Sequence, residues 1–78
     1  MELTKKQLEQ VKRQYRLSPR ETQVVDLILK GVDSNVEMTK ILGLNIGTTR
    51  RYVHDVYAKI GISSKLGVAL KIINTIQK

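Results

Sequence analysis

The feature that most constrains this chain is a pair of short helix patterns separated by only a tight turn. The first pattern begins at Ser34 and stops at Gly43, and the second begins at Asn45 and stops before Gly61. Serine and asparagine are favoured at helix N-caps, and glycine readily ends a helix in the left-handed conformation. Because apolar residues follow helical spacing in both patterns, the sequence predicts a helix-turn-helix here.

The other signals along the chain are also helical. The sequence has one proline and no sustained alternation of apolar and polar residues, so we expect an all-α fold. Thr4 and Gln7 form a capping-box pattern that predicts a first helix over residues 5–15. We expect residues 1–16 to be a helical extension outside the core domain, and residues 17–78 to form that domain.

Two further capping boxes follow the first helix. Ser18 and Glu21 form the stronger box, because Pro19 between them suits the first position of a helix. Ser34 and Glu37 form the weaker box, and we expect them to open the shorter helix of the helix-turn-helix.

Composition limits the functions that this chain can have. Its 78 residues suffice for one domain, and they include no cysteine and a single histidine. We therefore expect no disulfide, no metal site and no cofactor. One histidine without clustered carboxylates also leaves little for a catalytic centre, so we do not expect an enzyme.

Charge and hydropathy indicate the surroundings of the protein. No apolar run is long enough to span a membrane, and the N-terminus lacks the apolar core of a signal peptide, which predicts a cytoplasmic protein with no membrane partner. The net charge of +7 favours polyanions through counterion release. The alternative is that the excess lysines only keep a small protein in solution.

The longer helix of the pair, expected over residues 45–60, separates its residues into two faces. At about 100° per residue, its apolar face carries Ile46, Thr49, Val53, Val56, Tyr57 and Ile60. Arg50, Arg51 and His54 lie together on a neighbouring flank. An arginine fork donates two hydrogen bonds to O6 and N7 of guanine in the major groove of DNA. These three residues are therefore the expected contacts with DNA bases.

Contacts with DNA phosphates are expected around the same surface. Hydroxyl groups and a lysine on the opposite flank of the longer helix suit phosphate oxygens, as do the free N–H groups at helix starts. The residues expected to make them are Ser34, Asn35, Thr48, Tyr52 and Lys59. Two alternatives stay open: Arg51 can pair with Asp55 one turn later, and a lone histidine such as His54 can simply occupy the surface.

At this point the chain resembles the DNA-binding domain of the LuxR family, also called GerE-like or NarL-like. The resemblance covers roughly residues 17–70. The segments that carry it are LSPRE at 17–21, SNVEM at 34–38, TTRRY at 48–52 and KIGI at 59–62. Within these segments or directly beside them, the chain departs from the family pattern at a few positions. Thr39 stands where alanine is usual, Thr49 where valine is usual, Tyr52 where histidine is usual and Val36 where lysine is usual.

The resemblance implies a four-helix domain with a central helix-turn-helix. It also implies that residues 45–60 form the recognition helix, that Arg50, Arg51 and His54 contact bases, and that the C-terminal helix joins two copies. The implied function is regulation of transcription in a bacterium, by activation or repression of a promoter, with RNA polymerase as a possible further partner. The chain contains no receiver or ligand domain, so it is either a stand-alone regulator or a fragment of a larger one.

The last helix, expected to begin at Ser63 or Ser64, carries more apolar residues than one packed stripe requires. We expect part of this surface to form a homodimer seam, so that the pair binds a palindromic site. The expected seam residues are Leu66, Leu70, Ile73 and Ile76. The alternative is that the remainder of a larger protein covers this helix.

Two other functions compete with a sequence-specific regulator. Region 4 of a sigma factor shares the Ser-x-x-Glu helix start and a helix-turn-helix, but the KIGI segment and the apolar last helix disfavour it. A helical protein-interaction module, an adaptor or antagonist of a transcription complex, would use the apolar last helix instead of the arginines. Tight binding to a protein together with no binding to any DNA duplex would favour that module.

Overall fold

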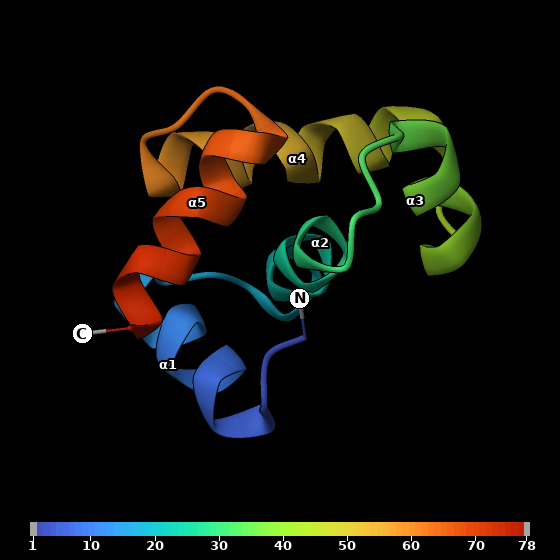
Figure 1. Ribbon diagram of the computed structural model, residues 1–78. Coiled ribbons are helices and arrows are strands. Elements are labelled where there is room, and N and C mark those ends of the chain that lie inside the picture. Colours follow the sequence, from blue (N-terminus) through green and yellow to red (C-terminus); the bar gives the residue numbers. More distant parts are fainter. Residues whose placement is uncertain (1, 78) are drawn as a thin grey trace.

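The computed structural model describes residues 2–77, which fold into five helices and contain no strand (Figure 1). This confirms the all-α class. No helix in this part of the chain is long and apolar enough to cross a membrane. The helices are α1 (Lys5–Tyr15), α2 (Pro19–Leu29), α3 (Asn35–Leu42), α4 (Ile46–Ile60) and α5 (Lys65–Ile76).

Every helix begins at a residue whose side chain accepts a hydrogen bond from a backbone N–H of the first turn. The capping boxes at the starts of α1 and α2 are complete, as predicted. The box predicted at α3 is only half formed. Ser34 Oγ accepts from the Glu37 backbone N–H at 3.3 Å, but the exposed Glu37 side chain does not bond back to Ser34. This helix start therefore has one capping bond instead of two.

Four helices end in the same way. The residue after the last turn takes a positive φ, and the next residue is apolar and donates its N–H to the carbonyl five residues earlier. This is the Schellman arrangement, which satisfies carbonyls that the helix end leaves free. The residue pairs that form it are Arg16–Leu17, Gly31–Val32, Gly43–Leu44 and Gly61–Ile62. Arg16, with φ 54°, is the only non-glycine with positive φ among the described residues.

Helix α2 lies at the centre of the fold. It packs against α1, α4 and α5, while α3 packs against α4 (Figure 1). The side chains of Val24 and Val25 are completely buried between these helices. The rest of the core consists of Val11, Leu17, Ile28, Leu29, Met38, Val53, Val56, Ile60, Val68 and Ile72.

Helix α1 belongs to this core. The Val11 side chain is fully buried in it, and the Tyr15 hydroxyl lies 3.0 Å from Thr75 Oγ1 near the end of α5. The sequence predicts residues 1–16 as an extension outside the core domain, whereas the structure packs α1 against both α2 and α5. The apolar stripe of α1 is short, so the sequence alone did not reveal how completely its central valine is covered.

We expect Val11→Ala to lower the free energy of unfolding by about 1–3 kcal/mol, because it removes two methyl groups from a fully buried site. Gln10→Ala, at an exposed position of the same helix, is the matched control and should change stability by less than about 0.5 kcal/mol. Urea denaturation followed by circular dichroism measures both. Equal effects of the two substitutions would mean that α1 is not part of the core in solution.

Candidate nucleic-acid interface

Helices α3 and α4 are joined by the three residues 43–45. Gly43 adopts the left-handed conformation with φ 67°, which ends α3 and turns the chain. Asn45 then caps α4, because its Oδ1 accepts from the Thr48 backbone N–H at 2.8 Å. The two helices and the short turn between them therefore lie where the sequence predicts them.

The buried face of α4 agrees with the predicted apolar face except at its first residue. Thr49, Val53, Val56 and Ile60 are buried, and Tyr57 packs partly against the core. The prediction was wrong for Ile46, whose side chain is 36 % exposed. A helical side chain leans over the turn before it, and Ile46 is the first residue of α4 and has no such turn beneath it.

The exposed face of α4 carries the three predicted base contacts. Arg50, Arg51 and His54 are all exposed. None of their side chains forms a hydrogen bond or ion pair within the described part of the chain. The alternative pair between Arg51 and Asp55 is therefore not formed. Each guanidinium group carries five N–H donors in a planar fork, and here two guanidinium groups and an imidazole face solvent along one helix.

The starts of α3 and α4 offer further donors. The first backbone N–H groups of a helix have no partner inside it. Ser34 is exposed, and its Oγ accepts a bond while its hydroxyl hydrogen stays available. Asn35 is partly buried, and its Oδ1 is buried without a hydrogen-bond partner. Thr48 and Tyr52 are partly buried, and Tyr52 packs against the core.

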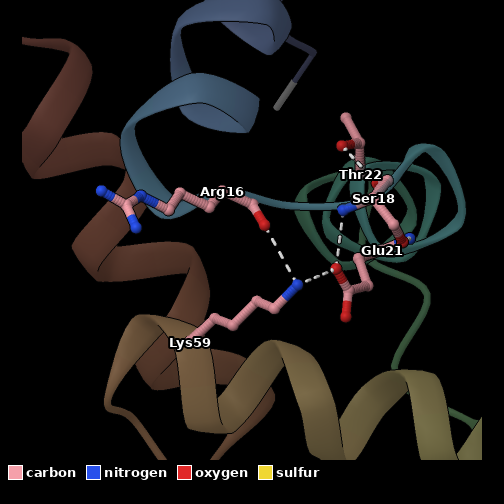
Figure 2. A network of polar contacts seen from close by, with 5 residues as sticks. All are labelled: Arg16, Ser18, Glu21, Thr22 and Lys59. Atoms are coloured by element: carbon pink, nitrogen blue, oxygen red, sulfur yellow. Dashed lines mark hydrogen bonds and ion pairs between the residues drawn. The ribbon is translucent and has the colours of Figure 1, made fainter.

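Lys59, by contrast, is bonded to other segments of the protein. Its Nζ donates to Glu21 Oε1 at 2.7 Å and to the Arg16 carbonyl at 3.0 Å (Figure 2). The same Glu21 oxygen accepts from the Ser18 backbone N–H at 2.6 Å, so one carboxylate caps α2 and binds α4. Figure 2 shows the Arg16 side chain pointing away from this network, so only its carbonyl takes part.

The Glu21 carboxylate is held in its charged form. Burial acts to raise its pKa, but hydrogen bonds from Lys59 and from Ser18, with the charge of Lys59, outweigh burial and leave the pKa below its usual value. The Glu21 side chain is 5 % exposed and that of Lys59 is 39 % exposed. The lysine can therefore reach water, whereas the carboxylate depends on its partners.

The prediction that Lys59 contacts phosphate stays a prediction, but this network gives the lysine an internal role that argues against it. If Lys59 turned towards DNA, a buried carboxylate would lose its counter-ion, which costs more than an exposed phosphate contact returns. The sequence identified Glu21 only as a capping residue. The missed signal is its position on the apolar face of α2, three and four residues before Val24 and Val25, where an acid requires a cation from another helix.

The predicted dimer residues separate into two groups. Leu66 and Leu70, one turn apart on α5, are 71 % and 60 % exposed. Ile73 and Ile76 are partly buried and pack against the core, so they offer only part of their surface to another molecule. Helix α5 therefore presents an unpartnered apolar ridge, and this ridge is shorter than the sequence predicts.

Within residues 2–77 no three histidine, cysteine or acidic side chains lie close enough to hold a metal ion together. In comparisons with known proteins, no family model, no curated protein and no solved structure matched this chain. The function therefore has to be argued from the residues and their geometry.

We expect the Glu21–Lys59 pair to make stability depend on pH. A carboxylate whose pKa is lower in the folded than in the unfolded state stabilises the fold above its unfolded-state pKa, and this contribution is lost as the pH falls through the folded-state pKa. At pH 7, Glu21→Gln should therefore lower the free energy of unfolding by about 1–3 kcal/mol. The deficit should shrink as the pH falls to about 3.

Thermal unfolding at several pH values measures this effect. Asp26→Asn is the matched control, because Asp26 pairs with Lys30 at 3.0 Å within α2 on a more exposed surface. That pair should contribute less than about 1 kcal/mol. A Glu21→Gln protein with the stability and pH profile of wild type would show that the network contributes nothing in solution.

Proposed function

We propose that this protein binds double-stranded DNA with sequence preference and regulates transcription, with α4 lying in the major groove. The observation that carries the proposal is the row of exposed Arg50, Arg51 and His54 side chains, without internal partners, on the solvent-facing flank of α4. A recognition helix needs such a row, because base edges are read by side-chain donors that no internal acceptor occupies.

The distribution of the other cations supports this proposal. Lys59 is bound to Glu21, and Lys71 Nζ donates to the Ile60 carbonyl at 2.9 Å, where it caps the end of α4. Lys30 is paired with Asp26. Arg50 and Arg51 break no internal bond when they meet an anion, so they bind DNA at a lower energetic cost than these lysines would.

The helix starts supply the proposed phosphate contacts. In this arrangement the free N–H groups at the start of α3, with the Ser34 hydroxyl and the Asn35 amide, hold one DNA strand. Thr48 and the phenol of Tyr52 contribute beside the first turns of α4. Lys59 is left out of this set because of its bond to Glu21.

The resemblance to the LuxR-type DNA-binding domain belongs to this proposal. In such a domain α2 to α5 would correspond to the four family helices, with α3 and α4 as the helix-turn-helix and α1 as an addition that packs on the core. The family's arrangement also places two copies on DNA. We propose that the ridge of Leu66 and Leu70 on α5 joins two copies of this chain in the same way.

In-vitro selection from a random duplex library tests the proposed function. Wild type should enrich a defined site, whereas the Arg50→Ala, Arg51→Ala double variant should enrich none, because each lost arginine removes about 1–3 kcal/mol of base discrimination. Arg13→Ala with Arg20→Ala is the matched control, since it removes the same charge from exposed positions of α1 and α2. The control should enrich the wild-type site.

Each outcome has a distinct meaning. Loss of enrichment in both double variants would show that net charge alone drives binding, and equal enrichment in all three proteins would remove Arg50 and Arg51 from the interface. Failure of wild type to enrich any site, with only salt-sensitive binding to bulk DNA, would overturn sequence-specific reading.

The dimer is tested by Leu66→Glu. Because Leu66 is 71 % exposed, the substitution should leave thermal stability within about 0.5 kcal/mol of wild type. It should convert a dimer to a monomer in sedimentation on the selected duplex, since a buried glutamate would face its own copy across the twofold axis. Gln10→Glu, on the exposed surface of α1, is the control of equal charge. A wild-type monomer on saturated DNA would contradict the proposed dimer.

The exposed ridge also favours a second function, a module that binds another protein through α5. The observation that favours this module is the exposure of Leu66 and Leu70 in the isolated chain. A partner bound equally by wild type and by the Arg50→Ala, Arg51→Ala variant, but lost with Leu66→Glu, would favour this function over DNA reading.

A further inference from the structure

Helices α3 and α4 meet through two threonine hydroxyl groups. Thr39 Oγ1 and Thr49 Oγ1 lie 2.7 Å apart, and Thr49 is completely buried. Each hydroxyl also reaches a carbonyl one turn earlier in its own helix: Thr39 Oγ1 lies 2.7 Å from the Asn35 carbonyl, and Thr49 Oγ1 lies 3.2 Å from the Asn45 carbonyl. The two hydroxyl protons can serve two of these three contacts at a time, so the hydroxyl pair joins the helices while bonding to either the Asn35 or the Asn45 carbonyl.

The hydroxyl pair brings the two helices closer than apolar side chains would allow. Two carbon atoms in contact stay about 3.5–4.0 Å apart, whereas the two oxygen atoms here are 2.7 Å apart. A methyl group in place of either hydroxyl would therefore push the helices apart by roughly 1 Å at this crossing. Protein interiors are tightly packed, so the side chains around this crossing cannot accommodate such a displacement of the helices.

The two carbonyls that flank the hydroxyl pair belong to the parts of the molecule that face DNA in the proposed function. Asn35 begins α3, where phosphate contacts are proposed, and Asn45 begins α4, where Arg50 and Arg51 follow within two turns. The crossing at Thr39 and Thr49 therefore sets how far the phosphate-binding end of α3 lies from the arginines. Discrimination between bases depends on side chains held within about 0.5 Å of their productive positions.

We propose that Thr39 and Thr49 are a positioning pair that fixes the spacing of α3 and α4 and thereby sets the sequence specificity of α4. This inference rests on the proposed function. Neither hydroxyl touches DNA in this arrangement, because Thr49 is buried and Thr39 is turned towards it. The pair acts through Asn35 and the arginines, and its effect must show in discrimination rather than in affinity for all DNA.

Two substitutions at one position separate the hydroxyl from its surroundings. Thr49→Val keeps the shape of the side chain and replaces the hydroxyl by a methyl group, whereas Thr49→Ser keeps the hydroxyl. Binding to the selected duplex and to an unrelated duplex at one fixed salt concentration, with the melting temperature, is measured for each. We expect Thr49→Val to lose roughly tenfold in preference for the selected duplex. Thr49→Ser should stay within about twofold of wild type.

A third variant tests the spacing itself. Thr39→Ala combined with Thr49→Val removes the oxygen that the new methyl group would meet, so the helices can approach again without a hydrogen bond. We expect this double variant to regain most of the preference that Thr49→Val loses. If it instead discriminates as poorly as Thr49→Val, steric spacing is not the cause and the positioning role is overturned.

Other results overturn the inference in recognisable ways. Thr49→Val with the preference of wild type would show that the pair does not affect reading. A loss that is equal on both duplexes and follows the melting temperature would show a purely structural role. A wild-type protein without any preference would overturn the proposed function, and the specificity role with it, whereas preference retained in both wild type and Thr49→Val overturns only this inference.

Discussion

Burial of α2 against three other helices is the constraint on which the rest of this structure depends. Val24 and Val25 are fully covered, and Ile28 and Leu29 nearly so. Each such side chain contributes roughly 1.5–3 kcal/mol when it leaves water. Because α1, α4 and α5 all pack on α2, this one helix determines where the exposed face of α4 and the ridge of α5 lie relative to each other.

Glu21 converts this apolar contact into a defined orientation. Apolar faces can slide over one another at small cost, but a buried carboxylate has to find its donors at fixed places. Glu21 finds them in the Ser18 backbone and in Lys59, and Lys59 also binds the Arg16 carbonyl. Arg16 itself adopts a left-handed conformation that a non-glycine residue adopts at a cost. Its carbonyl thereby becomes available to the lysine, so the local strain is offset by a tertiary bond.

The sequence predicted most of what depends on neighbouring residues. Caps such as Thr4 and Ser18 and the glycines that end helices are local signals, and the helix boundaries follow from them closely. The sequence failed where contacts join distant segments. The charge of Lys59 is typical of a phosphate ligand. Only the fold places this lysine beside Glu21, 38 residues away. The packing of α1, with its buried Val11, on α2 and α5 is another contact between distant segments that local signals do not reveal.

The candidate site was predictable to the same degree and for the same reason. Arg50, Arg51 and His54 share a flank by helical spacing alone, and their exposure agrees with that spacing. Whether these side chains have internal partners depends on the acids nearby. The sequence could not decide whether Arg51 pairs with Asp55. The closeness of Thr39 and Thr49 was also beyond reach, because a crossing between two helices is set by packing and not by either helix.

Two lysines and two arginines of this chain are used differently, and the difference follows from the chemistry of the two basic side chains. Lys59 and Lys71 reach carbonyl or carboxylate oxygens of the protein with a single flexible ammonium group, which fits positions where one donor has to meet acceptors from several directions. Arg50 and Arg51 stay in solvent on α4 with their planar forks unused. A fork that matches two acceptors in one plane gains little from isolated backbone oxygens and most from the edge of a guanine. The bonds that hold α4 in place therefore use Lys59 and Lys71 and not Arg50 or Arg51, so substitution of these two arginines leaves those bonds intact.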